Sequence, residues 1–447
     1  MEGPVRDAPQ HSDTGHATPG EVLDLLIIGA GIGGVMALYY ARKAGLSALV
    51  LERQDVVGGL WATLPAWQDI QFGRCDWTLG DLPIAGEDQA SIRDNIQAWV
   101  DRFGLAGSIR LGTEVRRATR SGELWIVETA AETFRARHLI SATGAHNRPF
   151  VPEPARESVE LRELHSSQLR DAADLAGRDV VVVGGGASAY DLLDLCFEYQ
   201  ARRVIWVYRN ARWMMPTRKP KNVAGSPREL ARAQMEGATV EEISRGLQAK
   251  LVDRYAKFGL EAIRPEGQFD LGRDQLLPGR HRMIENFSKI ERHRAEVSRI
   301  RGRRAELSTG DAVEADLLLW GTGYQVDLGF FANESLSRIT GHDELCAQCG
   351  CGLRAIAEPG LYFLAAGLES TGTAPWSYAL LARTLMSHVQ GQATLEPVPL
   401  ARKLNHFHYP AFLAERDPVN FPQGHWQDEY QRLAFAHPQD LPLPIPD

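Results

Sequence analysis

The sequence predicts an α/β fold with two parallel-sheet domains, and two stretches of the 447-residue chain carry that prediction. Each stretch begins with an apolar run, passes through a glycine-rich turn into a helical pattern, and ends in a second apolar run. The first covers residues 24–61 and the second residues 179–209. Because parallel strands buried on both faces read as near-continuous apolar runs, each stretch indicates a strand–turn–helix–strand unit.

Glycines occupy the positions in the first unit where a dinucleotide needs them. Leu25–Ile28 leads into Gly29-Ala-Gly31-Ile-Gly33-Gly34. Gly29 makes the turn, Gly31 lets a pyrophosphate approach the backbone, and Gly34 lets helix and strand pack closely. The pyrophosphate is expected at the N-terminus of the helix, where the dipole and unpaired N–H groups favour an anion.

An acidic residue ends the second strand of this unit. Ala48–Leu51 closes on Glu52, which is placed to accept hydrogen bonds from ribose hydroxyls. Arg53 and the segment Gly58-Gly59-Leu60-Trp61 follow directly, and we expect them at the same nucleotide. The unit is therefore interpreted as a Rossmann-like dinucleotide site.

Composition excludes several classes of partner. Hydrophobic content of 44% and charged content of 24% are ordinary for a globular protein, and the length suits two or three domains. The net charge of −8 argues against nucleic acid or an anionic membrane surface as a partner. No apolar run approaches the ~20 residues that span a bilayer. The polar N-terminus predicts a disordered tail rather than a signal peptide, and five cysteines in so long a chain favour the cytoplasm.

The region between the two units predicts a helix and several strands. Ser91 with Asp94 predicts a helix cap, and Gly104 a stop after Phe103. A strand over Ile109–Val115 is expected to bring Val115 to the cofactor. The strand His138–Ser141 leads to Ala142, Thr143 and Gly144, and Pro149, Pro152 and Pro154 then mark a domain crossing.

The second unit repeats the first in function rather than in sequence. The β-branched run Asp179–Val183 enters a turn and helix that contain Gly184, Gly186, Ala187, Ser188 and Ala189. The next strand, Arg203–Tyr208, puts Tyr208 where the first unit has Glu52, with Arg209 one residue later. An acid repels a 2′-phosphate and an arginine pairs with it, so FAD is assigned to the first site and NADPH to the second. The alternative for Arg209 is a solvated surface charge.

These assignments predict an NADPH-binding domain inserted within an FAD-binding domain. A helical insertion is expected from the capping box Thr239–Glu242 and from an apolar stripe through Ile243, Leu247, Leu251 and Tyr255, which indicates core packing. The expected boundaries are a tail at 1–20, FAD-binding parts at 21–160 and 313–395, an NADPH-binding domain at 161–312 with the insertion near 225–285, and a C-terminal extension at 396–447.

Taken together, the motifs resemble the flavin-containing monooxygenases, which are class B flavoprotein monooxygenases related to the Baeyer–Villiger enzymes. The resemblance spans about residues 24–389. It rests on the first glycine turn, Glu52 with Gly58–Trp61, the return-strand motif Ala142–Gly144, the second glycine turn through Asp191, and Gly321-Thr322-Gly323-Tyr324 as a second ATG-type motif. It implies that Thr322 and Gly323 lie at a cofactor.

The resemblance also implies a reaction. NADPH reduces FAD, O₂ forms a flavin C4a-(hydro)peroxide, and one oxygen atom enters a small organic substrate, with nitrogen or sulfur as the first choice of acceptor. The family's identifying stretch is degenerate here: His165 and Ser166 fit it, whereas Val159, Leu161 and Leu169 depart from it. His165 is the candidate catalytic residue, and Arg170 agrees with the heteroatom-oxidising branch.

Three alternatives stay open. One is a Baeyer–Villiger or oxidative-decarboxylating monooxygenase acting on a carbonyl substrate, resembling the plant indole-3-pyruvate enzymes. Another is an NADPH-dependent flavin disulfide reductase, suggested by Cys346, Cys349 and Cys351, which with His342 could also hold zinc, although an ordinary loop is favoured and no metal is expected. A third is a non-catalytic FAD-bound sensor, against which both unbroken turns argue.

The neighbourhood of the flavin and of the substrate is less defined in the sequence. Asp69, Arg74 or Asp76 is expected near the flavin. Trp67, Trp77, Trp376 and Tyr378 suggest an apolar or aromatic pocket. The expected partners are a small-molecule substrate and O₂, with no nucleic acid or membrane, and homodimer formation is left open.

Overall fold

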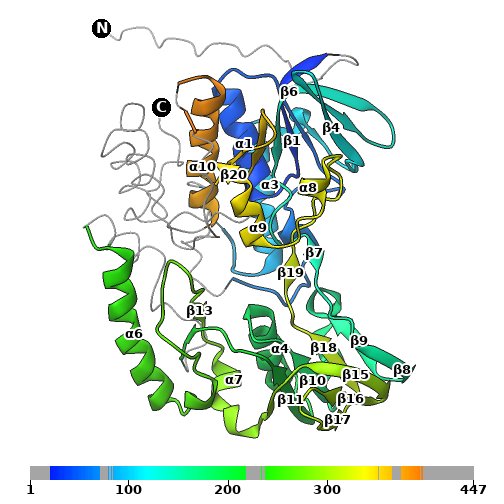
Figure 1. The fold of residues 1–447 in the computed structure, drawn as a ribbon, viewed down its shortest axis with the longest axis vertical. Helices are drawn as coiled ribbons and strands as arrows, with labels where there is room; N and C mark the ends of the chain where they lie inside the picture. Colours follow the sequence, from blue (N-terminus) through cyan, green and yellow to red (C-terminus); the bar gives the residue numbers. More distant parts are fainter. Residues whose placement is uncertain are drawn as a thin grey trace.

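The computed structural model describes residues 21–70, 79, 82, 84–217, 233, 237–350, 352–364, 374–392 and 394–395. It contains a nine-stranded sheet in the upper part of Figure 1 and a five-stranded sheet in the lower part. The chain begins in the first sheet, crosses to the second, and returns to the first with its last strands. This topology confirms the predicted α/β fold, with one unit inserted in the other.

The first sheet is centred on β1 (Val22–Ile28), which pairs in parallel with β2 and β6. Along β1, Leu25 and Ile27 enter one core and Leu26 and Ile28 the other, as expected for a strand buried on both faces. The remaining strands of the sheet are β2 (Ala48–Leu51), β3 (Ile109–Arg110), β4 (Arg117–Ser121), β5 (Leu124–Glu128), β6 (Thr133–Ser141), β20 (Cys349–Gly350), β21 (Arg354–Ala355) and β22 (Leu361–Phe363).

Three helices cover one face of this sheet: α1 (Ile32–Lys43), α3 (Gln89–Arg102) and α10 (Ala374–Val389). Helix α3 begins earlier than predicted, because the carboxylate of Asp88 caps it by accepting from the Ser91 backbone N–H at 3.0 Å. Gly104 follows its end at φ +59°, as expected. The predicted strand at 109–115 is wrong beyond Arg110, where β3 ends. Shorter helices are α2 (Leu60–Thr63), α8 (Glu334–Ser337) and α9 (His342–Ala347).

The second sheet is parallel throughout, in the order β14 (Glu291–Arg294), β11 (Arg203–Tyr208), β10 (Asp179–Val183), β18 (Leu317–Trp320) and β9 (Arg162–His165). The valines of β10 alternate between two cores, which explains its unbroken β-branched run. Three helices cover one face of this sheet: α4 (Ala187–Glu198), α6 (Val240–Lys257) and α7 (His281–Glu285). A four-stranded sheet covers the other face and consists of β8 (Ala155–Val159), β15 (Val297–Gly302), β16 (Arg304–Leu307) and β17 (Ala312–Glu314).

Two short ribbons complete the fold. Strands β12 (Met214–Met215) and β13 (Leu277–Pro278) pair within the second domain. Strands β7 (Arg148–Pro149) and β19 (Tyr324–Gln325) pair where the chain crosses between the sheets, as Figure 1 shows. Because β8 and β18 lie in the second domain, we place the crossings near 144–150 and 321–327, in place of the expected boundaries at 160 and 313.

The helical insertion matches its sequence pattern where the structure describes it. Thr239 caps α6, and the predicted capping box with Glu242 is confirmed. Leu251 and Tyr255 are fully buried in the core of the second domain, so the apolar stripe is core packing. A second predicted box, Ser226–Glu229, lies outside the described residues, as do the tail at 1–20 and the extension at 396–447.

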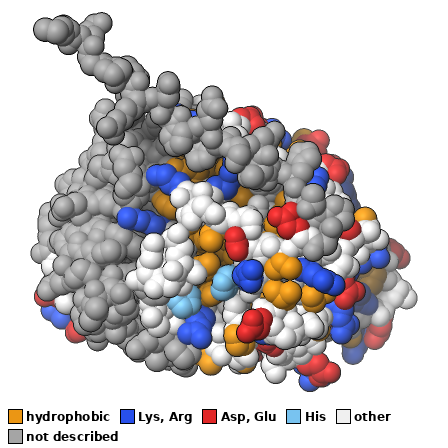
Figure 2. All heavy atoms as spheres, turned by 90° about the horizontal axis from the view of Figure 1, so that it is seen from above, with side chains coloured by type: hydrophobic (Ala, Val, Ile, Leu, Met, Phe, Trp, Pro, Cys, Tyr) orange, Lys and Arg blue, Asp and Glu red, His pale blue; other side chains and the backbone are white. Residues whose placement is uncertain are grey.

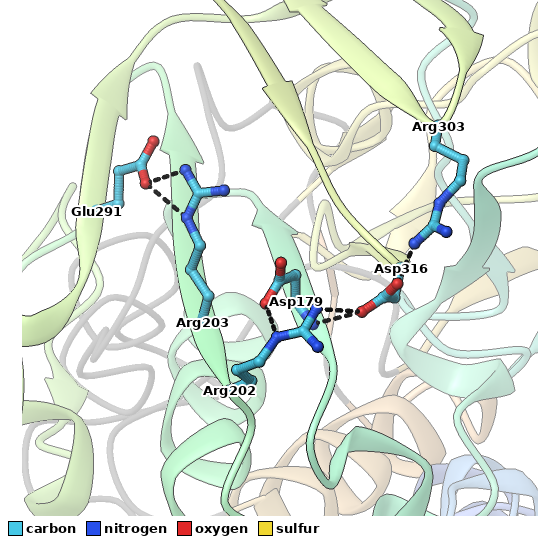
Figure 3. A network of polar contacts seen from close by, with 6 residues as sticks. All are labelled: Asp179, Arg202, Arg203, Glu291, Arg303 and Asp316. Carbon is cyan, nitrogen blue, oxygen red and sulfur yellow. Dashed lines mark hydrogen bonds and ion pairs between the residues drawn. The ribbon is translucent and has the colours of Figure 1, made fainter.

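An ion-pair network ties together the amino ends of the strands in the second sheet (Figure 3). Arg202 contacts Asp179 at 2.8 Å and Asp316 at 3.2 Å, and Arg303 also pairs with Asp316. Arg203 on β11 reaches Glu291 on the neighbouring β14 at 2.5 Å. Each arginine is more than 40% exposed, so each pair contributes about 0–1 kcal/mol.

Charges of both signs are interspersed over the first-domain face shown in Figure 2, as far as the structure describes it. Within the described residues, none of the helices combines the length and the apolar character needed to cross a bilayer.

Candidate functional site

A cavity of about 1060 Å³ lies at the meeting of the two domains and receives residues from both. The following candidate cofactor-binding residues line it: Gly29, Gly31, Gly33, Glu52, Arg53, Gly59, Leu60, Trp61, Val115, Ala142, Thr143, Gly144 and Ala187. The cavity lining does not include Gly34, His165, Gly184, Gly186, Ser188, Ala189, Arg209, Thr322 or Gly323.

The first glycine turn is shaped by the return-strand motif. Gly29 has φ +102°, and a Cβ on it would lie 2.7 Å from the carbonyl oxygen of Ala142. A Cβ on Gly34 would lie 1.8 Å from the carbonyl oxygen of Gly29. Any larger residue would force strand and helix apart, so these two glycines set the turn at the carboxyl end of β1.

The second glycine of the turn meets the segment that follows Glu52. A Cβ on Gly59 would lie 2.8 Å from the Cα of Gly31, and Gly59 has φ +57°. Gly31 is the N-cap of α1, and no side chain caps this helix in the described structure. The first-turn N–H groups of α1 are therefore left for an anion in the cavity.

Glu52 does more than face a ribose position. It is only 4% exposed and accepts from the backbone N–H of Ala30 at 2.6 Å and of Gln54 at 2.9 Å. The carboxylate thus holds the glycine turn closed from the neighbouring strand. Glu52 also lines the cavity, and a carboxylate has further lone pairs beyond the two that these bonds use.

The second turn repeats this construction. The Gly184 N–H donates to Val207 O at 2.9 Å, as the Gly29 N–H donates to Leu51 O at 2.8 Å. This register confirms Tyr208 as the counterpart of Glu52. A Cβ on Gly184 would lie 2.2 Å from the carbonyl oxygen of Gly321, the position that Ala142 holds in the first domain.

The helix after the second turn is also open at its start. Gly186 is the N-cap of α4 without a side-chain cap among the described residues, and a Cβ there would meet nothing within 4 Å. Ala189, by contrast, is fully buried against Gly321. The open backbone at Gly186 is where a second dinucleotide could approach, and Ser188 follows it in the first turn of α4.

Arg209 lies on the surface beside this turn. Its side chain is 74% exposed and pairs with Glu296 at 3.2 Å. The neighbouring Arg294 donates to Arg209 O at 3.1 Å and to Asn210 Oδ1 at 3.0 Å, which holds the end of β11. An exposed pair of this kind is weak, so a phosphate can displace Glu296 at little cost.

His165 is buried at the crossing between the domains and uses both ring nitrogens. Its Nε2 lies 3.0 Å from Gly323 O, and because a carbonyl only accepts, Nε2 carries the proton. Its Nδ1 accepts from the Ser167 N–H at 3.2 Å, capping a short 3₁₀ turn. Burial lowers the pKa of His165, and the bond to Gly323 offsets part of that shift.

Thr322 and Gly323 hold the same crossing. The Thr322 hydroxyl donates to Phe150 O, and Gly323 O accepts from the Phe150 N–H at 2.9 Å. These residues therefore join the outgoing and returning chain segments. The adjacent Tyr324 reaches the cavity, and its ring lies 5.1 Å from that of His165.

Trp67 joins the domains, although the sequence suggested a pocket. Its ring packs against the core of the second domain, and its indole N–H donates to Leu169 O at 2.6 Å. The next residue along the chain, Arg170, makes a second contact by donating to Thr63 O at 2.8 Å. Of the other expected pocket or flavin residues, Asp69 and Tyr378 line the cavity, whereas Arg74, Asp76, Trp77 and the Trp376 side chain lie outside the described residues.

The cysteines do not meet the cavity where they are described. Cys346 and Cys349 are 3% and 1% exposed and lie in the cores on opposite faces of the first sheet. Burial raises the pKa of the Cys349 thiol strongly, which disfavours a redox thiolate. Cys351 lies outside the described residues, and among those described no cluster of three His, Cys, Asp or Glu side chains is arranged to hold a metal.

One cavity group was not singled out from the sequence. Arg280 and Asp191 form an ion pair at 2.5 Å, with side chains 6% and 12% exposed. Asp191 belongs to the second glycine motif, but no pattern in the sequence indicated that Arg280, which is 89 positions away, would pair with it. Only the folding of the helical insertion onto α4 brings the two together.

Comparisons with known proteins agree with this geometry. Residues 26–243 match the family model described as pyridine nucleotide-disulphide oxidoreductase. A Baeyer-Villiger monooxygenase of Streptomyces coelicolor is 26% identical over 353 residues, which make up 70% of this chain and 66% of that protein. The chain matches 49–66% of the length of the first three curated relatives.

Solved structures share the fold. A flavin-containing monooxygenase from Stenotrophomonas maltophilia has a TM-score of 0.58 at 21% identity, covering 83% of this chain and 99% of that chain. A structure of OTEMO in complex with FAD and NADP has a TM-score of 0.64 at 17% identity, covering 84% of this chain and 86% of that chain. Both have the two-domain fold described above.

Proposed function

Because the family match, the curated relatives and the solved structures together support a class B flavoprotein monooxygenase, we propose that this chain uses FAD, NADPH and O₂ to insert one oxygen atom into a small organic substrate. The pair of matching glycine turns carries the proposal, since each stands at the carboxyl end of a central strand that pairs in parallel with both of its neighbours. In open α/β sheets, nucleotides bind at this edge. Two such sites suit a hydride donor beside a flavin.

The first site fits FAD by its chemistry. The turn from Gly29 to Gly34 leaves the uncapped start of α1 for a pyrophosphate, and Glu52 offers a carboxylate for ribose hydroxyls. FAD, when bound, supplies hydride acceptance and oxygen activation. The chain's own part is to hold the flavin and to exclude water, and Trp61, Leu64 and Ile70 provide apolar lining for that purpose.

The second site suits NADPH by analogous features. Gly186 leaves the start of α4 open, and Arg209 offers a guanidinium for the 2′-phosphate at the end of β11. Ala187 brings the first turn of α4 into the shared cavity. A nucleotide held at this turn would therefore have access to the shared cavity.

Nitrogen or sulfur is proposed as the acceptor, supported by Arg170, whose position in the motif agrees with the heteroatom-oxidising branch and which lines the cavity. The runner-up is insertion beside a carbonyl, supported by the Baeyer-Villiger relative. Product masses after incubation with a sulfide, an amine and a ketone separate the two: an S- or N-oxide supports the first, and an ester supports the second.

NADPH consumption coupled to O₂ uptake tests the enzyme class. Substrate-stimulated oxidation of NADPH, with bleaching of bound flavin under anaerobic conditions, is the expected result. If NADPH never bleaches the flavin, the monooxygenase and the disulfide reductase both fail and the sensor remains.

Cytoplasmic location and homodimer formation stay predictions, and size-exclusion chromatography of the purified chain tests the latter.

A further inference from the structure

Arg280 is a buried cation in the shared cavity. Four arginines line the cavity, and three of them, Arg53, Arg116 and Arg170, are exposed to solvent. The Arg280 side chain is only 6% exposed. Arginine stays protonated in proteins, and burying a charge is unfavourable unless partners compensate it. A buried arginine facing a cavity therefore marks a position built for a ligand or for a network.

The contacts of Arg280 fix its orientation without exhausting its donors. Nε donates to Asp191 Oδ1 at 2.5 Å, and Nη1 donates to Pro278 O at 2.7 Å. Asp191 is held in turn by the side chain of Gln68, whose Nε2 donates to Oδ2 at 3.2 Å. A guanidinium has five N–H groups, and Nη2 has no partner among the described residues. Nη2 keeps access to solvent, and Arg280 lines the cavity.

The phosphates of the two nucleotides already have their own positions in the proposed function. The uncapped start of α4 at Gly186 and the exposed Arg209 serve the second nucleotide. Asp191 lies one helical turn beyond Ala187, and its contact with Gln68 directs the pair toward the first domain. Arg280 thus lies between the second turn and the first domain, apart from the two features that the proposed function gives to the phosphates of the second nucleotide.

We propose that Arg280 binds an anionic group of the substrate, and that the preferred substrates carry a carboxylate. A carboxylate matches the planar donor fork of a guanidinium, and the cavity wall around it removes competing water. Asp191 compensates the charge when the cavity is empty of substrate and keeps the fork in place when an anion binds. Gln68 fixes Asp191 on the other side, so the three side chains form one preorganised receptor.

The test is calorimetric titration of the purified chain with thioether carboxylic acids and their methyl esters, from short aliphatic to aryl members. The wild type is expected to bind acids more tightly than the matching esters. Arg280→Gln should weaken acid binding about 10- to 100-fold and leave ester binding unchanged, because it removes a charged hydrogen bond. Arg282→Gln is the matched control: its guanidinium pairs with Asp194 and Glu198 outside the cavity, and it should keep the acid preference.

Three outcomes overturn the inference. No acid in the series binds more tightly than its ester; Arg280→Gln leaves the acid preference intact; or Arg280→Gln weakens binding of NADP⁺ and not of the acids, which assigns the arginine to cofactor phosphate. If Arg280→Gln does not fold, Arg280→Lys keeps a cation and must retain the preference in part. The inference rests on the proposed function for the reaction, whereas the binding of acids is tested independently of it. If the chain prefers acids but does not turn them over, only the proposed function is contradicted.

Discussion

Single residues determine the shape of the proposed FAD site, and Glu52 determines most of it. Its carboxylate accepts from two backbone N–H groups while almost fully buried, so it both closes the glycine turn and presents a negative charge to the cavity. The same acid that the sequence assigned to a ribose is thus also a structural ligand of the turn. A substitution at Glu52 should therefore alter flavin binding and stability together.

Glu52→Gln should lower the flavin content of the purified protein and its stability by about 1–3 kcal/mol, because the amide replaces an acceptor that faces the Ala30 N–H. The ratio of flavin to protein absorbance and a thermal melt measure both effects. Glu114→Gln is the control, since Glu114 lines the same cavity but is exposed. Unchanged flavin content in Glu52→Gln would contradict this role.

His165 joins Gly323 to the turn at Ser167 where the chain crosses between the domains, and its titration should be visible in the stability of the fold. Burial lowers its pKa below 6.5, so the unfolded chain takes up a proton first as the pH falls, and stability is lost from about pH 6.5 downward. The contribution is fully present above that pH. His138, whose pKa burial also lowers, acts in the same direction.

His165→Asn should therefore cost about 1–3 kcal/mol at neutral pH and flatten the decline of stability below pH 6.5, because the bond to Gly323 O is lost with the titrating ring. Denaturant unfolding at several pH values measures it. An unchanged slope in the variant would show that other groups carry the acid response.

At the scale of elements, each domain repeats one arrangement of strand, turn, helix and return strand. Gly29 packs on Ala142 and Gly184 packs on Gly321, with Gly144 and Gly323 both at φ +80° two residues further on. The sequence predicted these turns because their glycines are local signals. It did not reveal the start of α3, because Asp88 and Ser91 are both ordinary capping residues, or the early end of β3.

The two glycines of the second turn should separate folding from binding. Gly184→Ala should destabilise the fold by roughly 1–3 kcal/mol, since it has φ +133° and its Cβ would overlap Gly321 O. Gly186→Ala should keep wild-type stability but raise the KM for NADPH about tenfold, because the added methyl group would stand where the cofactor pyrophosphate approaches the protein backbone. Thermal melts and NADPH titrations decide, and equal effects of both variants on stability would contradict the assignment.

For the whole molecule, function depends on how the two domains face each other. The crossing ribbon of β7 and β19, the Trp67 contact to Leu169, and the Gln68–Asp191 bond all join them at the cavity. None of these contacts follows from local sequence, because the partners are far apart in the chain. The sequence accordingly predicted a dinucleotide turn in each domain. It did not single out Arg280, and it suggested a pocket position for Trp67, which the structure places in a contact between the domains.

Trp67→Ala should slow the reduction of flavin by NADPH several-fold while leaving the flavin content intact, because the variant loosens the domain contact and not the FAD site. It should also cost about 1–3 kcal/mol through the lost packing and the lost indole hydrogen bond, since the ring is only partly buried. Trp67→Phe, which keeps a ring but not the N–H, should fall between. Anaerobic stopped-flow absorbance measures the rate, and an unaltered rate in Trp67→Ala would show that the contact is only structural.

The most direct test of a two-nucleotide monooxygenase is incubation with NADPH, oxygen-18 gas and a substrate that stimulates NADPH oxidation, followed by the mass of the product. We expect one oxygen-18 atom in each product molecule, with NADPH and O₂ consumed in equal amounts. NADPH oxidation that yields only hydrogen peroxide, or a product whose new oxygen comes from water, would contradict the account.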